Sequence, residues 1–125
     1  MKILVIDDNE LLLESLVLTL ESEGFDVLSA ADGNEAIEIY SQMWEAIDAV
    51  VSDWCLPGFN GIDVFYALRV IDPGVKFYLI SGYMDSAAKS QALGNGIKDV
   101  AQKPFRSQNI SSMIQKAITE ESHVK

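Results

Sequence analysis

Short apolar runs alternate with amphipathic segments along the whole chain, and this alternation constrains the possible folds more than any other feature of the sequence. Apolar runs of strand length indicate five strands, at residues 2–6, 25–30, 48–52, 75–81 and 97–101. Apolar residues at helical spacing indicate five helices, within residues 10–23, 36–44, 62–71, 85–93 and 110–118. Strands that alternate with helices pair in parallel through right-handed crossovers. The pattern therefore predicts an α/β fold with a five-stranded parallel sheet and helices on both faces.

Length and composition limit the classes of protein to which the chain can belong. Its 125 residues, 49% hydrophobic and 22% charged, predict one globular domain over residues 1–125, with a tail that frays from residue 120. The net charge of -10 repels nucleic acid and anionic membranes, so direct binding to either is not expected. The absence of a basic leader and of 18 successive apolar residues predicts a cytoplasmic protein. The single cysteine, Cys55, cannot form an internal disulfide, which agrees with a reducing compartment.

Polar residues gather where the predicted strands end. Asp7 and Asp8 follow the first strand, Asp53 ends the third, Ser81 ends the fourth, and Lys103 follows the fifth. The spacings correspond to whole strand-helix units, so these side chains return to one edge of the sheet. In such folds ligands bind beyond the carboxyl ends of the strands. We therefore expect a cleft that contains three carboxylates, a hydroxyl and an ammonium group.

Each of these residues has an ordinary structural explanation when it is taken alone. An Asp after a strand is often a helix cap or a turn residue, and a lone Lys is usually a solvated surface charge. Three clustered carboxylates, however, repel one another and raise each other's pKa values unless a cation lies among them. Mg²⁺ suits this donor set because it takes one or two carboxylates and completes its shell with water and phosphate oxygens. A bound phosphoryl group would explain Ser81 as a donor and Lys103 as its counter-ion.

These residues resemble the receiver domains of two-component response regulators. The resemblance covers the whole chain and rests on four motifs in order and at fitting spacing: "ILVIDDNE", "VVSDWCLPGFNG", "YLISGY" and "DVAQKPF". It implies the flavodoxin-like strand order 2-1-3-4-5. It also implies that the chain is a signalling switch and catalyses only its own phosphorylation and dephosphorylation.

The resemblance assigns a role to each acidic residue. Asp53 would accept a phosphoryl group from the phosphohistidine of a sensor histidine kinase or a phosphotransfer protein. Asp8, Asp53 and the backbone carbonyl of Cys55 would bind Mg²⁺, while Asp7 would act through water. The acyl phosphate formed on Asp53 would later hydrolyse.

The remaining site residues are also assigned by resemblance. Ser81 and Lys103 would contact phosphoryl oxygens, and a cis peptide bond between Lys103 and Pro104 would direct the lysine into the cleft. Cys55 and Tyr83, each two residues after a site residue, would flank the path of the attacking water. We therefore expect Cys55 and Tyr83 to set the lifetime of the phosphorylated state.

Two features depart from the common pattern or extend it. Similar receivers usually carry Tyr or Phe three residues before the lysine as a switch, whereas this chain has Val100. The usual route of signal transmission is therefore in doubt, although the phosphorylation chemistry is not. Leu11, Leu12 and Leu18 leave the first helix apolar on more than one face, which indicates a docking or dimer surface.

Three alternative interpretations stay open. A flavodoxin-like mononucleotide binder would need a Ser/Thr/Gly-rich loop after the first strand, where this chain has "DDNE", which repels phosphate. A receiver-like interaction module that never accepts phosphate would usually lack an acid or the lysine, and none is lost. A receiver cut from a hybrid histidine kinase agrees with the "SGY" and "QKPF" motifs.

Overall fold

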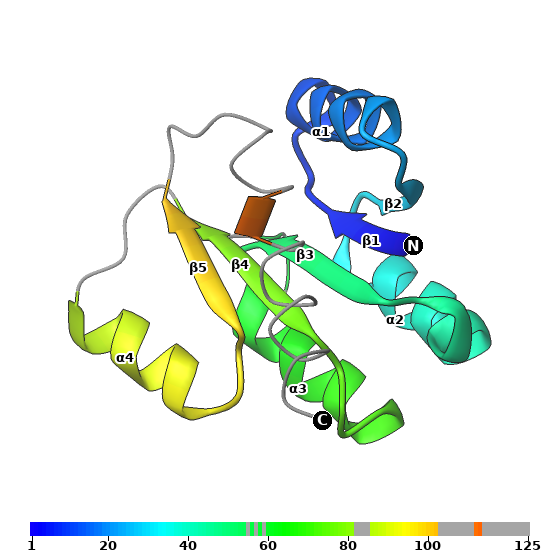
Figure 1. Cartoon of the computed structure of the whole chain (residues 1–125). Coiled ribbons are helices and arrows are strands. Elements are labelled where there is room, and N and C mark those ends of the chain that lie inside the picture. The colour runs from blue at the N-terminus through cyan, green and yellow to red at the C-terminus, as the bar shows by residue number, and fades with distance from the viewer. Residues whose placement is uncertain (55, 57, 59, 82–85, 103–111, 114–125) are drawn as a thin grey trace.

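A computed structural model of the chain describes residues 1–54, 56, 58, 60–81, 86–102 and 112–113 (Figure 1). The five strands are β1 (Lys2–Ile6), β2 (Asp26–Ala30), β3 (Ala49–Asp53), β4 (Phe77–Ser81) and β5 (Asp99–Gln102). The helices are α1 (Glu10–Ser22), α2 (Gly33–Met43), α3 (Gly61–Ile71) and α4 (Ser86–Gly94), with a short 3-10 helix, η1 (Trp44–Ala46), after α2. All strand pairs are parallel, in the order β2-β1-β3-β4-β5. The predicted fold and strand order are confirmed.

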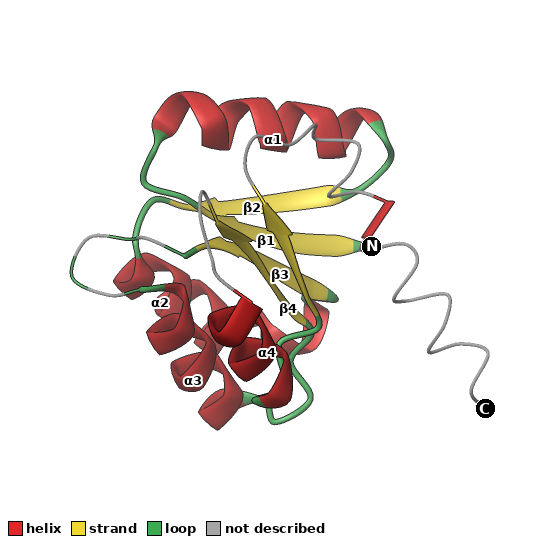
Figure 2. Ribbon diagram, turned by 90° about the vertical axis from the view of Figure 1, so that its left-hand side faces the viewer, coloured by secondary structure: helices red, strands yellow, loops and turns green. Residues whose placement is uncertain are grey.

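The sheet separates two layers of helices, because successive side chains of a strand point to opposite faces. In β1, Ile3 and Val5 pack in one core cluster with residues of α1, whereas Leu4 and Ile6 pack in another with residues of α2, α3 and α4. Figure 2 shows α1 on one side of the sheet and α2, α3 and α4 on the opposite side. Of the predicted helix at 110–118, only residues 112–113 lie within the described part, and both are helical. Met113 packs against the α1 cluster.

Helix α1 ends in a turn at Gly24, directly after the predicted helical segment 10–23. Gly24 has a positive φ of 96°, and its N–H donates to the carbonyl of Glu21 at 3.0 Å. The N–H of Phe25 donates to the carbonyl of Leu20 at 3.1 Å, and the Phe25 side chain is buried. This pair of bonds is a Schellman motif, which satisfies the last carbonyls of a helix and places an apolar residue against it.

Helix α4 ends in the same way, and these turns shorten the strands that follow them. The N–H of Ile97 donates to the carbonyl of Ala92 at 3.2 Å, after Gly96 with a φ of 112°. β2 and β5 therefore begin after Phe25 and Ile97, whose amides bond the preceding helix, and not at the predicted residues 25 and 97. β4 begins at residue 77 and not at 75, since the N–H of Val75 donates to the carbonyl of Asp72 at 3.1 Å.

The ends of α2 differ from the sequence prediction. The helix begins at Gly33, three residues before the predicted apolar face, because Asp32 caps it: its Oδ1 accepts the N–H of Glu35 at 2.8 Å. Trp44, predicted on the buried face of this helix with Tyr40, lies in η1 and is 36% exposed. No helix among the described residues has the length and apolar character needed to cross a membrane.

Candidate metal and phosphoryl site

Three carboxylates meet at the carboxyl-terminal edge of the sheet. The parallel register of β1 and β3 pairs Ile6 with Ser52, so the residues that follow each of them emerge side by side. Asp7, Asp8 and Asp53 each offer an oxygen, and these three oxygens lie within 4.8 Å of one another. Asp7 and Asp53 are buried, at 1% and 6% exposure, while Asp8 is exposed. The predicted clustering of the three acids is therefore present.

The backbone holds Asp7 in place from both sides. Its N–H donates to the carbonyl of Ala30 at the end of β2, at 3.1 Å. Its Oδ1 accepts the N–H of Asn9 at 2.9 Å. Asn9 in turn caps α1, because its side chain accepts the N–H of Leu12 at 3.2 Å. The acidic residues therefore lie in a short turn that is anchored to both the sheet and the first helix.

Asp53 is the last residue of β3 and lies opposite Ile80 of β4. The N–H of Trp54 donates to the carbonyl of Ile80 at 2.8 Å, and the carbonyl of Trp54 accepts the N–H of Gly61 at 2.6 Å. The hydroxyl of Ser52 donates to the carbonyl of Asp53 at 3.0 Å. These bonds tie the chain next to Asp53 to β4 and to the start of α3, so the backbone that carries its carboxylate is held in place.

Gly61 matters to the site in a way that the sequence did not reveal. A Cβ atom at this position would lie 2.6 Å from Cδ2 of Leu79 and 2.7 Å from the carbonyl oxygen of Asp53. In the sequence, Asn60-Gly61 indicates only a turn before the helix. The structure shows a capping box, in which the side chains of Asn60 and Asp63 each accept the other's N–H, at 3.0 and 3.2 Å. The Asn-x-x-Asp spacing in the sequence was the signal that could have identified this capping box.

The other predicted residues fall inside and outside the described part of the chain. Ser81 is the last residue of β4, one position beyond the strand partner of Asp53, and is 2% exposed. Val100 lies opposite Leu79 in the sheet and packs half-buried against the core beneath α2, α3 and α4. The four remaining predicted residues lie outside the described residues, and their roles stay predictions: Cys55, Tyr83, Lys103 and Pro104.

The donor set fits a hard divalent cation. Carboxylate oxygens are the ligands that Mg²⁺ and Ca²⁺ prefer, and a cation is the simplest relief for three acids at this spacing. The three side chains come from two adjacent strand ends that backbone hydrogen bonds hold in place, so little reorganisation is needed to bind an ion. We take Asp7, Asp8 and Asp53 as the residues that would hold the metal.

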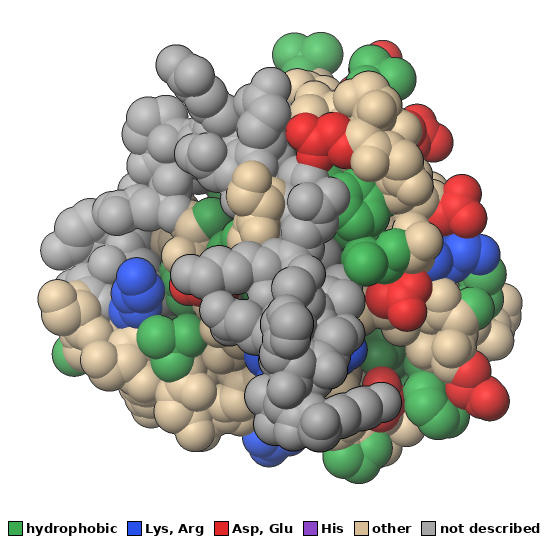
Figure 3. All heavy atoms as spheres, in the orientation of Figure 1, with side chains coloured by type: hydrophobic (Ala, Val, Ile, Leu, Met, Phe, Trp, Pro, Cys, Tyr) green, Lys and Arg blue, Asp and Glu red, His purple; other side chains and the backbone are tan. Residues whose placement is uncertain are grey.

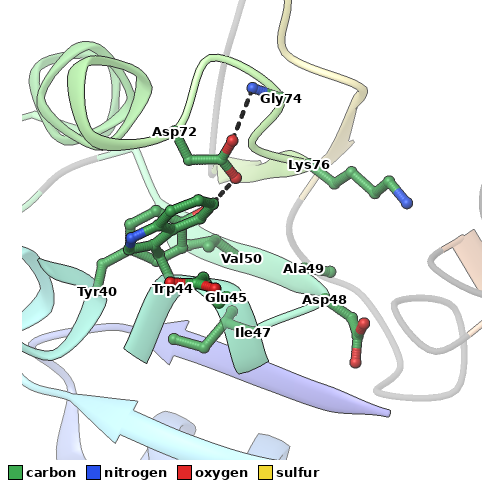
Figure 4. Close-up of a pocket in the computed structure, with 10 residues that line it drawn as sticks. All are labelled: Tyr40, Trp44, Glu45, Ile47, Asp48, Ala49, Val50, Asp72, Gly74 and Lys76. Atoms are coloured by element: carbon green, nitrogen blue, oxygen red, sulfur yellow. Dashed lines mark hydrogen bonds between the residues drawn. The ribbon is translucent and has the colours of Figure 1, made fainter. Parts of the chain in front are cut away.

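A pocket of about 200 Å³ lies at the opposite edge of the sheet, where β3 and β4 begin (Figure 4). There the hydroxyl of Tyr40 donates to Oδ2 of Asp72 at 3.0 Å, and the N–H of Gly74 donates to Oδ1 at 3.0 Å. Burial raises the pKa of Tyr40 above its ordinary value, and the hydrogen bond to Asp72 and the charge of that carboxylate raise it further. Both oxygens of Asp72 are occupied by donors of the chain itself. This pocket therefore has a structural carboxylate and lies away from the acidic cluster.

Comparison with known families identifies the class of protein. A model of the response regulator receiver domain matches residues 3–115. The DNA-binding response regulator MtrA of Mycolicibacterium smegmatis is 34% identical over 113 residues, which cover 90% of this chain and 48% of MtrA. The chain thus belongs to the response regulator receiver domains of two-component signalling, and it spans about half the length of this relative.

Other relatives place the same fold in different contexts. The sensor kinase CckA of Brucella abortus is 28% identical over 116 residues, which are 93% of this chain and 12% of the kinase. A receiver domain protein from Clostridium thermocellum superposes with a TM-score of 0.91 at 29% identity, over 99% of this chain and 98% of that one. A response regulator from Burkholderia pseudomallei has a TM-score of 0.79 at 25% identity, over 99% and 74% of the two chains. That protein contains a phosphorylated aspartic acid, a calcium ion and citrate.

Proposed function

We propose that Asp53 accepts a phosphoryl group in a Mg²⁺-dependent reaction and that the chain acts as a phosphorylation-activated switch. The observation that carries this proposal is the convergence of the carboxylates of Asp7, Asp8 and Asp53 within 4.8 Å, with Asp53 held at the end of β3. Mg²⁺, when bound there, would neutralise the carboxylates and the phosphoryl oxygens together. The phosphorylated aspartate of the Burkholderia pseudomallei protein supports the same chemistry.

The reaction needs little beyond position and charge. A carboxylate oxygen of Asp53 attacks phosphorus, the bond from phosphorus to the donor imidazole breaks, and the imidazole leaves with the electron pair and takes up a proton. Phosphoryl transfer has a loose transition state, so a rigidly held nucleophile supplies much of the rate. Water later attacks the phosphorus, which releases inorganic phosphate and restores the Asp53 carboxylate.

The remaining site residues act on the phosphoryl group or on its lifetime. Ser81 donates a hydrogen bond to one phosphoryl oxygen, and Lys103, directed by a cis bond to Pro104, pairs with another. The backbone carbonyl of Cys55 would be a further protein ligand of Mg²⁺. The side chains of Cys55 and Tyr83 limit the access of water and so slow hydrolysis of the acyl phosphate.

The partner is a sensor histidine kinase or a phosphotransfer protein in the cytoplasm, which supplies the phosphoryl group. Leu11 and Leu18, one face of α1, are 81% and 60% exposed and form an apolar surface for such a partner or for a second copy. The similarity to part of the sensor kinase CckA supports the alternative that the donor belongs to the same polypeptide, as in a hybrid kinase. The downstream partner is a protein, since the acidic surface disfavours nucleic acid.

The proposal is tested by incubating the chain with Mg²⁺ and acetyl phosphate and measuring its intact mass. We expect a gain of one phosphoryl group that disappears in Asp53→Asn and when the metal is removed with EDTA. Asp72→Asn, which changes a carboxylate at the opposite edge, serves as the matched control and should still be phosphorylated. If the unaltered chain gains no phosphoryl group, the receiver-like interaction module becomes the better interpretation.

A further inference from the structure

A groove of about 180 Å³ lies between α3 and α4, the two helices that run side by side below β4 and β5 in Figure 1. Trp54, Ile62 and Tyr66 form an aromatic and apolar wall on the α3 side. Ala88 and Ala92 form the α4 side. The volume is that of one large side chain, so the groove has the size and lining of an anchor pocket.

The groove exists because α4 fills little space. In the sequence SAAKSQALG only Ala92 is buried, and the other described side chains of α4 are small or point to solvent. Of the aromatic and apolar residues that line the groove, Tyr66 is 38% exposed. The groove therefore presents partly exposed apolar surface between the two helices. Such surfaces mark sites of protein contact.

The two parts of the sequence differ in charge. Residues 1–68 contain 14 Asp or Glu and one basic residue, whereas residues 69–125 contain 5 Asp or Glu and 8 Lys or Arg. Figure 3 shows acidic side chains mostly on the side of α1 and α2. The two helices that form the groove contribute Arg69 and Lys89 as cations.

Two cations border the groove. The Cζ atom of Arg69 lies 5.3 Å from the ring centroid of Phe65 and 5.2 Å from that of Tyr66. Its Nη1 donates to the carbonyl of Asn95 at 3.0 Å. Lys89 is exposed on α4, next to Ala88. Within the described part of the chain neither cation has a carboxylate partner. Arg69 is held at the opening by stacking on Tyr66, and it still has N–H donors to offer.

Asp63, the acidic side chain next to the lining residue Ile62, is already engaged. Asp63 of α3 accepts the N–H of Asn60 in the capping box, as described above. The amide side chain of Gln91 lines the opening and can bond the backbone of an extended ligand. The groove therefore combines apolar side chains, the amides of Asn60, Gln91 and Asn95, and two neighbouring cations that have no carboxylate partner among the described residues.

We propose that the α3–α4 groove is a docking site for a peptide segment of a partner protein that presents an aromatic or branched apolar side chain flanked by carboxylates. The apolar side chain fills the space between Tyr66 and Ala88, and the carboxylates pair with Arg69 and Lys89. Charge complementarity selects this partner, because a basic segment would be repelled at the opening and attracted to the acidic side of α1 and α2. The proposal does not depend on phosphorylation of Asp53.

The test is a titration of the unphosphorylated, ¹⁵N-labelled full chain with the capped hexapeptide Glu-Glu-Phe-Leu-Glu-Glu, followed by amide chemical shifts. We expect saturable shifts at the lining residues Ile62, Tyr66 and Gln91. In a Trp44→Phe background the fluorescence of Trp54 should change over the same concentration range. The peptides Lys-Lys-Phe-Leu-Lys-Lys and Glu-Glu-Gly-Gly-Glu-Glu, which lack the charge or the apolar anchor, should not shift these amides.

Two variants separate docking from general charge effects. Ala88→Trp fills the groove and should raise the dissociation constant of the acidic peptide at least about tenfold. Lys89→Glu, at an exposed position that does not endanger folding, should raise it about fivefold at low salt. Lys2→Glu makes the same charge change at the far edge of the sheet and should leave the dissociation constant of the acidic peptide unchanged. Shifts confined to other surfaces, or equal effects of Lys2→Glu and Lys89→Glu, would overturn the proposal.

Discussion

Aspartate side chains have different surroundings at the two edges of the sheet. At the amino-terminal edge, Asp72 accepts one hydrogen bond on each oxygen, from Tyr40 and from the N–H of Gly74 (Figure 4). At the carboxyl-terminal edge, Asp53 and its two acidic neighbours lie within 4.8 Å of one another. A carboxylate surrounded by donors joins elements together, whereas carboxylates surrounded by carboxylates call for a cation.

The comparison shows why residue type alone does not identify a functional site. Both aspartates lie at the end of an element: Asp72 is the C-cap residue of α3, and Asp53 is the last residue of β3. Their neighbours distinguish them, and those neighbours come from elements distant in the sequence. Substitutions that act on one edge and spare the other therefore test the distinction directly.

The largest difference in the free energy of unfolding should come from adding one methyl group at each edge of the sheet, at Gly61 and at Gly74. Gly61→Ala places a Cβ against Leu79 and the carbonyl of Asp53, so we expect a loss of about 2–3 kcal/mol in the free energy of unfolding. The shift of Asp53 should also slow phosphorylation by acetyl phosphate. Gly74→Ala is the matched control, because its Cβ would meet only Asp72, at an ordinary 3.5 Å. Urea denaturation measures both; equal losses would show that Gly61 is not specially constrained.

Removing the structural carboxylate should cost stability and spare the metal site. Asp72→Ala deletes two hydrogen bonds and leaves the buried hydroxyl of Tyr40 without its partner, so unfolding should become easier by about 2 kcal/mol. The dissociation constant for Mg²⁺, followed by Trp54 fluorescence in a Trp44→Phe background, should not change. A weaker affinity for Mg²⁺ in this variant would mean that the two edges are coupled.

Removing a carboxylate from the acidic cluster should have the reverse effect: affinity for Mg²⁺ should fall, and the stability of the metal-free chain should not. Asp8→Asn takes away one charge and one predicted ligand, and we expect affinity for Mg²⁺ to fall about tenfold. In the absence of Mg²⁺ the same variant should be more stable than the unaltered chain, since repulsion among the three acids is reduced. Denaturation with and without the metal measures both effects. A less stable metal-free variant would contradict the explanation.

The smallest effect concerns pH and belongs to the amino-terminal edge alone. The pKa of Tyr40 is raised above 10.0 in the folded chain, so above that pH the unfolded chain loses a proton that the folded chain keeps. Stability should therefore fall as pH rises beyond about 10, by at most about 1.4 kcal/mol per pH unit. Tyr40→Phe should remove this contribution. An identical pH profile of stability in the two proteins would exclude Tyr40 as its source.

The sequence predicted the elements well because their signals are local. Apolar runs and helical spacing identified all five strands and the four helices that lie within the described residues, and the spacing of strand ends predicted that Asp7, Asp8 and Asp53 would meet. Strand starts were less accurate, since the amides of Phe25 and Ile97 bond to preceding helices, which an apolar run does not reveal.

The features that the sequence missed depend on distance in three dimensions. Tyr40 and Asp72 are 32 residues apart and meet only because α2 and α3 pack together. The constraint on Gly61 comes from a neighbouring strand, and a turn signal carries no information about it. Helical spacing marks position 44 as buried. Trp44 is nevertheless exposed, because α2 ends one residue earlier, at Met43.

The order of the strands also bears on how the site forms during synthesis. The three carboxylates all lie within the first 53 residues, and β1 and β3 are adjacent strands that need no later segment to pair. Ser81 follows only with β4, and the predicted phosphate-binding lysine follows later still. A chain that emerges from its amino terminus therefore presents the three carboxylates first, whereas the bonds that anchor Asp53 form only when Gly61 and Ile80 have followed.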